Sequence, residues 1–466
     1  MKHHDLIIPS EAGTDPFENC RLGRKPYADV LTQIVSSYSD GFVLAINNEW
    51  GAGKSTFIKM WRQDLINNGY RTLFYNAWEN DFEKDVLVAL ISELEDLKDS
   101  ESLELYQTVL EKGALLSKKI GPGILKAALK RYIGIDSEEL NKVLEGAAEI
   151  GFDSLEKEIQ EHNKRKVSLK GFRESLEKFI HKADPEKPVV FYIDELDRCR
   201  PNYAVEVLEE VKHLFSVPGI VFVLSIDKEQ LGHAVRGVYG SEQINSEEYL
   251  RRFIDLEYTL PSPPHHLVTN YLFDFYSLGD FFNSDRSRQF INDEANFRSF
   301  ALNFFRLYPL NFRQQEKLYG HLKVVFSVCE KDDYIFPPAL LLLLYFKNFK
   351  NDLYKEIRSK TLTAQELFYR CENLLPQFVF ETKEYLPFYY GFLLLTDLYQ
   401  NGLNRKKDLL VQIAPSNFQT SLKSKYRTEN DEIRDLLLEM RQKYFYEGNN
   451  LDKITNRIEL LETLRN

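Results

Sequence analysis

The first half of the chain contains short apolar runs that alternate with segments of helical period. Four of these runs are mostly apolar: 42–46, 71–78, 188–193 and 219–227. Runs of this length and composition are typical of strands that are buried on both faces. A further strand pattern follows the end of a helix within 248–261. The alternation predicts an α/β fold with a parallel central sheet flanked by helices.

Two other regions lack strand patterns. Residues 98–180 are charged and helical, and the chain after about 262 is helical and rich in Leu, Phe and Tyr. We therefore expect a helical insertion within the α/β core and an all-α C-terminal region. The expected domains are the first part of the core at 1–97, the insertion at 98–180, the second part of the core at 181–264, a helical lid at 265–330 and a C-terminal helical domain at 331–466.

The first apolar run leads into a turn of small residues and then into a helix that begins near Thr56. Strand, glycine turn and helix form the layout of a phosphate-binding loop (P-loop), in which backbone N–H groups and a helix N-terminus face an anion. Gly51 and Gly53 permit a close approach that a Cβ would block. Lys54 can reach the β- and γ-phosphates, Ser55 can ligate Mg²⁺, and Thr56 can hydrogen-bond the α-phosphate.

The loop departs from the usual G-x-x-x-x-G-K-[S/T] pattern at its first position, where Asn48 replaces glycine. Asparagine tolerates the left-handed backbone region better than most residues, so we expect the loop to keep its shape. The residues of this stretch that we expect to hold the nucleotide are Asn48, Trp50, Gly51, Ala52, Gly53, Lys54, Ser55 and Thr56.

A pair of acids, Asp194 and Glu195, ends the third apolar run. A buried strand there delivers both carboxylates to its C-terminal edge, where open parallel sheets bind ligands. We expect Asp194 to hold Mg²⁺ through water and Glu195 to take the proton of the attacking water. A strand can also end in two acids for structural reasons, but the glycine turn upstream favours nucleotide binding.

Polar residues at other predicted strand ends have both a functional and a structural interpretation. Ser225 or Asp227 can sense the γ-phosphate, and Asp227 is included among the nucleotide-binding candidates, although it can equally cap the next helix. Glu79 can orient a water molecule, although a carboxylate there is more often a helix cap or an ion-pair partner.

Three arginines are candidates for stabilising charge on the transferring phosphoryl group. Arg251 and Arg252 lie where ring ATPases place an arginine that reaches the nucleotide of a neighbouring subunit, and either can instead pair with Glu247 or Glu248. Arg313 lies near the start of the expected lid helix. We expect Arg252 to act on a neighbouring subunit and Arg313 to act within its own chain.

Composition limits the class of protein. The 466 residues are 43% hydrophobic, enough for two or three domains with cores. The net charge of −11 argues against a protein that coats nucleic acid, although not against a local basic patch. Four cysteines without C-x-x-C spacing indicate neither a disulfide framework nor a zinc site. No apolar run reaches the roughly 20 residues that span a bilayer and no signal peptide opens the chain, so we expect a cytoplasmic protein without a transmembrane segment.

Residues 118–131 combine an apolar helical face with basic residues: Lys118, Lys119, Lys126, Lys130 and Arg131. Such a stretch can contact anionic lipid, nucleic acid or an acidic protein. It can also be an ordinary helix that packs on a core with its charges in solvent. The pattern leaves these alternatives open.

Taken together, these motifs resemble the KAP family of P-loop NTPases over about residues 15–325. The resemblance is carried by Arg21–Arg24, Asn48–Thr56, Tyr75–Glu79, Ile193–Pro201, Leu224–Asp227 and Tyr249–Ile254. Its most specific features are the tryptophan before Gly-x-Gly-Lys-Ser and the Asp-Arg-Cys after the acidic pair.

The resemblance implies a core of the additional-strand type related to the AAA+ and STAND ATPases, ATP rather than GTP as ligand, Mg²⁺, and assembly into a homo-oligomer. Many family members carry transmembrane helices between the two nucleotide motifs, whereas the corresponding interval here is polar. Members often occur with partner enzymes in bacterial anti-phage defence. Partner proteins encoded by neighbouring genes are therefore expected by analogy.

We therefore expect a self-assembling ATPase whose chemistry is carried by Lys54, Ser55, Asp194 and Glu195, and whose helical regions recruit or regulate a partner. Two alternatives remain open at this point. One is a switch or scaffold that binds ATP without hydrolysing it. The other is a motor or sensor that nucleic acid stimulates, with a steep dependence on salt.

Overall fold

The computed structural model describes residues 7–11, 13–38, 41–83, 85–116, 154–215, 217–283, 293–329, 335–376, 379, 385–403, 408–414, 417–426, 430–443 and 451–463. The chain divides into two compact units, Met1–Ser262 and Pro263–Asn466, and each is described by itself. The basic stretch 118–131 lies outside the described residues. The finer division into insertion, lid and C-terminal domain stays a prediction.

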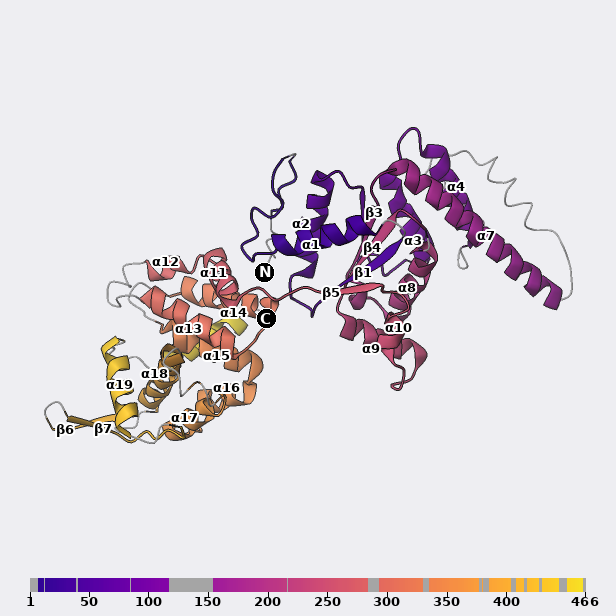
Figure 1. The fold of residues 1–466 in the computed structure, drawn as a ribbon. Coiled ribbons are helices and arrows are strands. Elements are labelled where there is room, and N and C mark those ends of the chain that lie inside the picture. Colours follow the sequence, from indigo (N-terminus) through magenta and orange to yellow (C-terminus); the bar gives the residue numbers. More distant parts are fainter. Residues whose placement is uncertain are drawn as a thin grey trace. The chain divides into compact units, whose positions relative to one another are not determined.

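The first unit is an α/β domain built on a five-stranded sheet with the order β2-β3-β4-β1-β5 (Figure 1). All of its strand pairs are parallel. This sheet with helices on both faces confirms the predicted fold class. The elements are, in chain order, α1 (Lys25–Ser37), β1 (Phe42–Asn47), α2 (Lys54–Asn67), β2 (Thr72–Asn76), α3 (Val86–Glu93), η1 (Leu94–Leu97), α4 (Leu103–Leu116), α7 (Ser154–Ala183), β3 (Val189–Asp194), η2 (Leu196–Arg198), α8 (Pro201–Phe215), β4 (Ile220–Ile226), α9 (Lys228–Tyr239), α10 (Ser246–Leu250) and β5 (Leu256–Thr259).

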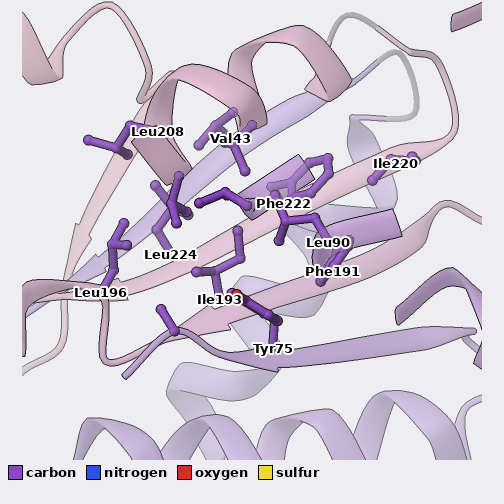
Figure 2. Packing of buried hydrophobic residues seen from close by; sticks show 14 of the residues in the cluster. Val43, Tyr75, Leu90, Phe191, Ile193, Leu196, Leu208, Ile220, Phe222 and Leu224 are labelled. Carbon is purple, nitrogen blue, oxygen red and sulfur yellow. The ribbon is translucent and has the colours of Figure 1, made fainter. Parts of the chain in front are cut away.

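Side chains of the central strands alternate between two separate apolar cores, because successive residues of a strand point to opposite faces. Val43, Phe191 and Phe222 belong to the core that α3, α4, α7, α8 and α9 cover, and Figure 2 shows these side chains gathered on one side of the sheet. Tyr192 and Val223 face the opposite core, which α1 and α2 cover. Burial on both faces explains why these strands read as nearly continuous apolar runs.

The predicted insertion contributes two helices to the first core. α4 and α7 lie side by side (Figure 1), and Lys112 of α4 donates a hydrogen bond to Ser175 Oγ of α7 at 2.7 Å. The second half of α7 places Phe172 and Phe179 in the core, where both are fully buried. The insertion is therefore joined to the sheet by the described part of α7.

The edge strand β2 is partly covered by Arg62 of α2. Its Nε donates to Thr72 Oγ1 at 3.1 Å, and its guanidinium lies 5.5 Å from the ring centre of Phe74. Glu93, at the end of α3, is also close to this arginine. Burial, followed by the nearby Asp96, raises the pKa of Glu93 to about 7. A covered edge is less open to pairing with a strand of another molecule.

We predict that Glu93→Gln stabilises the first unit at pH 8 and leaves its stability unchanged at pH 4. The folded state retains the Glu93 proton at a pH where the unfolded chain has lost it, so stability falls as pH rises from about 4.5 to about 7. Allowing for partial solvent screening, we expect the substitution to raise the free energy of unfolding at pH 8 by about 1–2 kcal/mol. Urea unfolding followed by circular dichroism measures it, with the exposed Glu104→Gln as the control. An equal gain at both pH values would contradict the assigned cause.

The second unit is mainly helical, as predicted, and many of its helices are lined by aromatic residues. Its helices are α11 (His265–Phe275), α12 (Gly279–Phe282), α13 (Asp293–Leu307), α14 (Phe312–Ser327), α15 (Pro337–Phe349), α16 (Asn351–Arg358), α17 (Ala364–Glu372), α18 (Leu386–Gly402), α19 (Asn430–Lys443) and α20 (Leu451–Thr463). A short antiparallel hairpin, β6 (Leu410–Ala414) and β7 (Asn417–Thr420), was not predicted. Its strands are brief and mostly exposed, so they lack the buried apolar runs by which the others were identified.

Candidate nucleotide-binding site

The glycine turn connects β1 directly to the first turn of α2. Gly51 and Gly53 both have a φ of 83°, in the left-handed region that residues with a Cβ rarely adopt. Gly53 is the N-cap of α2, and its carbonyl accepts the Phe57 N–H at 3.1 Å. The helix therefore begins at Lys54, with its unpaired N–H groups and positive end at the turn. This geometry suits a phosphate group.

Asn48 keeps the loop intact for a different reason from the one predicted. Its φ is not positive, so the left-handed tolerance of asparagine is not used at this position. The Asn48 side chain instead forms hydrogen bonds, accepting from Glu49 N at 2.7 Å and donating through Nδ2 to the Leu260 carbonyl at 2.6 Å. A glycine at this position would lack both contacts.

Lys54 is nearly buried and points back along the loop. Its Nζ donates to the carbonyl oxygens of Asn48 at 2.6 Å and Glu49 at 3.1 Å. Burial lowers the pKa of Lys54, and the nearby carboxylates of Asp197, Asp227 and Asp194 oppose that shift, in that order. The ammonium group thus lies inside the loop among three carboxylates, where an incoming anion would complement it.

The tips of β3 and β4 place polar side chains on the α2 side of the sheet. Asp194 is in register with Ser225, which is in turn in register with Ile46 at the end of β1. Alternation from Tyr192 and Val223 directs Asp194 and Ser225 toward the face that α2 covers. Asp194 is 2% exposed, and its Oδ1 accepts the Glu195 N–H at 3.0 Å. The buried Ser225 hydroxyl has no hydrogen-bond partner among the described residues.

Glu195 follows β3 in a strained conformation. Its φ of 60° is unusual for a residue with a side chain, and such outliers concentrate at functional sites. Oε1 pairs with Arg198 Nη1 at 2.6 Å, and Oε2 lies 3.4 Å from the amide nitrogen of Asn76 on β2. Burial is the main cause that raises the pKa of Glu195, while Arg198 opposes it. The carboxylate is therefore held beside the strand ends by two partners.

Trp50 joins the P-loop to two carboxylates on neighbouring elements. Its backbone N–H donates to Asp227 Oδ2 at 3.2 Å, and its indole N–H donates to Asp197. Asp227 also accepts the Gln230 N–H and so caps α9, which confirms the structural alternative considered for this residue. The sequence did not identify Asp197 as a site residue, although it is the aspartate of the specific Asp-Arg-Cys motif. The contact between Trp50 and Asp197 gives the P-loop and this motif a shared structural role.

Ser55 and Asp194 supply oxygen donors of the kind that Mg²⁺ prefers. Ser55 lies in the first turn of α2, and Asp194 lies on the face of the sheet that α2 covers. Within the described residues no group of three His, Cys, Asp or Glu side chains could hold a metal ion. A Mg²⁺ ion here would take its remaining ligands from phosphate oxygens and water, as Mg²⁺ commonly does.

The remaining candidates lie in different surroundings. Arg251 pairs with Glu248 at 3.2 Å, as the structural alternative predicted, whereas Arg252 is exposed and has no side-chain partner among the described residues. Glu79 is exposed and does not cap α3, because Asp85 accepts the Val88 N–H there. Arg313 is exposed on α14 of the second unit, and its role stays a prediction.

In the sheet, β4 lies between β1, which precedes the phosphate loop, and β3, which ends in the acidic pair. This extra strand between the two motifs is what the resemblance implied, and the fold and the loop together define a P-loop NTPase. More specifically, the chain belongs to the KAP family: residues 24–294 match the KAP family P-loop domain. Proteins of this class bind nucleotides through such a loop.

Individual proteins show weaker similarity. Over 158 residues the chain is 27% identical to the phage T7 exclusion protein of Escherichia coli (strain K12), a match that covers 34% of this chain and only 19% of that protein. The Aeropyrum pernix ORC2 protein aligns with 12% identity and a TM-score of 0.26, covering 95% of this chain and 86% of ORC2. C. elegans PCH-2 aligns with 11% identity and a TM-score of 0.28, covering 72% and 70% of the two chains.

The structure also bears on the predicted absence of a transmembrane segment. Among the described residues, no helix is both long enough and apolar enough to cross a bilayer.

Proposed function

We propose that this protein binds ATP with Mg²⁺ at the P-loop and hydrolyses it. The observation that carries the proposal is the convergence of the loop lysine and the acidic pair at one edge of the sheet. Lys54 interacts electrostatically with Asp194, which adjoins Glu195. An ammonium group, a helix N-terminus and a pair of carboxylates at one place match the needs of phosphoryl transfer to water.

Each residue has a role in this reaction. The backbone N–H groups at Gly51–Ser55 and the Lys54 ammonium bind the phosphates and oppose the charge that develops on them. Ser55 and Asp194 would hold Mg²⁺, which would neutralise part of the negative charge of the phosphates. Glu195 accepts the proton of the attacking water, and the raised pKa of its carboxyl moves it toward the range suited to a general base. The buried Ser225 hydroxyl is free to donate to a phosphate oxygen or to water.

A non-hydrolysing switch is the second candidate, and a specific observation favours it. The Glu195 carboxylate is already paired with Arg198, whose guanidinium also lies 5.7 Å from the ring centre of Trp78. A carboxylate held in this way is a poor base until the ion pair opens. Under this alternative, ATP binds tightly and turnover is negligible.

Phosphate release by the purified full chain with Mg²⁺, measured against ATP and GTP, tests the proposal. We expect release with ATP that requires Mg²⁺. Tight binding of ATP with no phosphate release would support the switch, and failure to bind either nucleotide would overturn both candidates. Stimulation of release by DNA or RNA at low salt would favour a nucleic-acid-dependent role.

We also propose that hydrolysis depends on assembly of several copies, with Arg252 reaching the nucleotide of a neighbouring copy. Its exposure and lack of a side-chain partner among the described residues leave this guanidinium available. Arg252→Ala is expected to lower turnover by about 100-fold. Arg251→Ala is the matched control, because Arg251 already pairs with Glu248. Light scattering with and without ATP measures assembly, and a monomer with full turnover would contradict this proposal.

The setting of the activity is proposed on similarity alone. The relative in Escherichia coli is named for exclusion of phage T7, and the match covers only a fifth of it. We infer a role in defence against phage, exerted with partner proteins encoded nearby. Loss of protection against a phage panel when the neighbouring genes are deleted, but not when unrelated genes are, would support this inference.

A further inference from the structure

The two residues that follow the end of β5 are hydrogen-bonded to the nucleotide-binding loop. Asn48 Nδ2 donates to the Leu260 carbonyl at 2.6 Å. Arg24 Nη1 donates to the Pro261 carbonyl at 2.6 Å, while its Nη2 donates to the Ala52 carbonyl within the loop at 3.2 Å. One guanidinium therefore bridges the loop and the segment after β5.

These contacts are well shielded from water. Arg24 is 3% exposed, and Leu260 is fully buried. A buried guanidinium is costly unless its donors are used, and the planar fork of arginine suits two acceptors at once. Hydrogen bonds in such surroundings hold their partners more firmly than exposed ones do.

The bonded segment is also the start of the connection to the second unit. The sequence continues Leu260-Pro261-Ser262-Pro263-Pro264, and the first unit ends at Ser262. Proline fixes φ and favours extended, semi-rigid chain, so a displacement at Leu260 or Pro261 passes along this segment rather than being absorbed in it.

We propose that Asn48 and Arg24 act as positioning residues that fasten the P-loop to Leu260 and Pro261, so that nucleotide in the loop changes the segment leading into the second unit. This inference rests on the proposed function, because it takes nucleotide as the signal. Phosphate binding draws the loop N–H groups inward, including that of Ala52, which now lies 3.4 Å from the Glu49 carbonyl. The Ala52 carbonyl shares its peptide unit with the Gly53 N–H, another of these loop donors, so it moves when that N–H turns toward a phosphate. Arg24 transmits that movement to Pro261.

The replacement of the usual loop glycine by asparagine has a purpose under this proposal. Glycine would leave the Leu260 carbonyl without its Asn48 donor, and the loop would be joined to the segment through Arg24 alone. Asn48 therefore adds a second connection at the point where the common motif has none.

Hydrogen exchange of backbone N–H groups in the full chain, followed by mass spectrometry, tests the proposal. In Asn48→Gly without nucleotide, peptides covering 257–268 should exchange about fivefold faster than in the parent protein, the effect of losing one buried hydrogen bond. Arg24→Lys should also speed exchange in these peptides, because a lysine cannot bridge two carbonyls as the arginine does. Asn80→Gly is the matched control, since it removes a comparable bond to the Asn76 carbonyl at 2.9 Å that does not involve this segment.

A second measurement adds Mg²⁺ and the ATP analogue AMP-PNP. The parent protein should show altered exchange in peptides 257–268, and Asn48→Gly should show less than half of that change. Unaltered exchange in both nucleotide-free variants, or a full response in Asn48→Gly, would overturn the proposal. If the parent protein binds no AMP-PNP, the proposed function fails, while the nucleotide-free comparison still tests the connection.

Discussion

Replacing Glu195 by glutamine is expected to abolish most ATP turnover while ATP still binds. Glutamine preserves the size of the side chain and can still accept a hydrogen bond from Arg198, but it cannot take a proton from water. Loss of a general base typically costs 10²- to 10⁴-fold in rate, so we expect phosphate release to fall by about 10³-fold. The substrate-binding groups at Lys54 and the loop N–H groups are untouched by the change.

Two measurements separate this outcome from a general loss of structure. Phosphate release gives the rate, and titration with a fluorescent ATP analogue gives the affinity. Glu83→Gln is the matched control, because it makes the same chemical change at an exposed carboxylate after β2. Turnover in Glu195→Gln close to that of the parent protein would rule out Glu195 as the base. A rate and an affinity that fall together would point to damage of the pocket instead.

Replacing Lys54 by alanine is expected to weaken ATP binding by about 100-fold. Each hydrogen bond to a charged group contributes about 1.5–3 kcal/mol, and the ammonium group is placed to make such bonds with the terminal phosphates. The change also leaves the nearby Asp194, Asp197 and Asp227 without their opposing charge, so the pocket would repel an anion. Binding and turnover should therefore both be lost.

The control for this variant comes from the same helix. Lys59→Ala removes an exposed lysine of α2, so this variant has the same net charge as Lys54→Ala. Because Lys54 also donates to two loop carbonyls, Lys54→Met is a useful second variant that retains most of the buried stem. Isothermal titration calorimetry gives the affinity. An affinity for ATP within about threefold of the parent protein in both Lys54 variants would remove the main support for a nucleotide pocket.

The sheet could be predicted because its strands are buried on both faces. Runs such as 42–46 and 189–193 have no polar interruption, and the glycine turn and acidic pair mark where two of them end. In contrast, β6 and β7 have mostly exposed residues and present no such run. The local sequence pattern thus predicts a strand when every residue of the strand must be apolar to be buried. It fails when a strand is exposed and can be built from either polar or apolar residues.

The contacts within the site could not be predicted in the same way. Trp50 and Asp197 are 147 positions apart, and Asn48 and Leu260 are 212 apart, so no local spacing indicates either pair. Backbone propensity gave the wrong reason why the loop tolerates asparagine at position 48. The φ of Asn48 is not positive, and its side-chain hydrogen bonds hold the loop instead. Glu195 pairs with Arg198, three residues along the chain, although the φ of 60° at Glu195 lies outside the helical region in which residues at this spacing are usually neighbours.

All three tryptophans of the chain, Trp50, Trp61 and Trp78, lie in the first unit, in the P-loop, on α2 and just after β2. The second unit has tyrosine as its only strong ultraviolet emitter. Indole fluorescence of the unlabelled protein therefore originates entirely from the first unit, and Trp50 lies in the nucleotide-binding loop itself. Quenching or a spectral shift upon adding a ligand would report on the first unit, without an introduced dye.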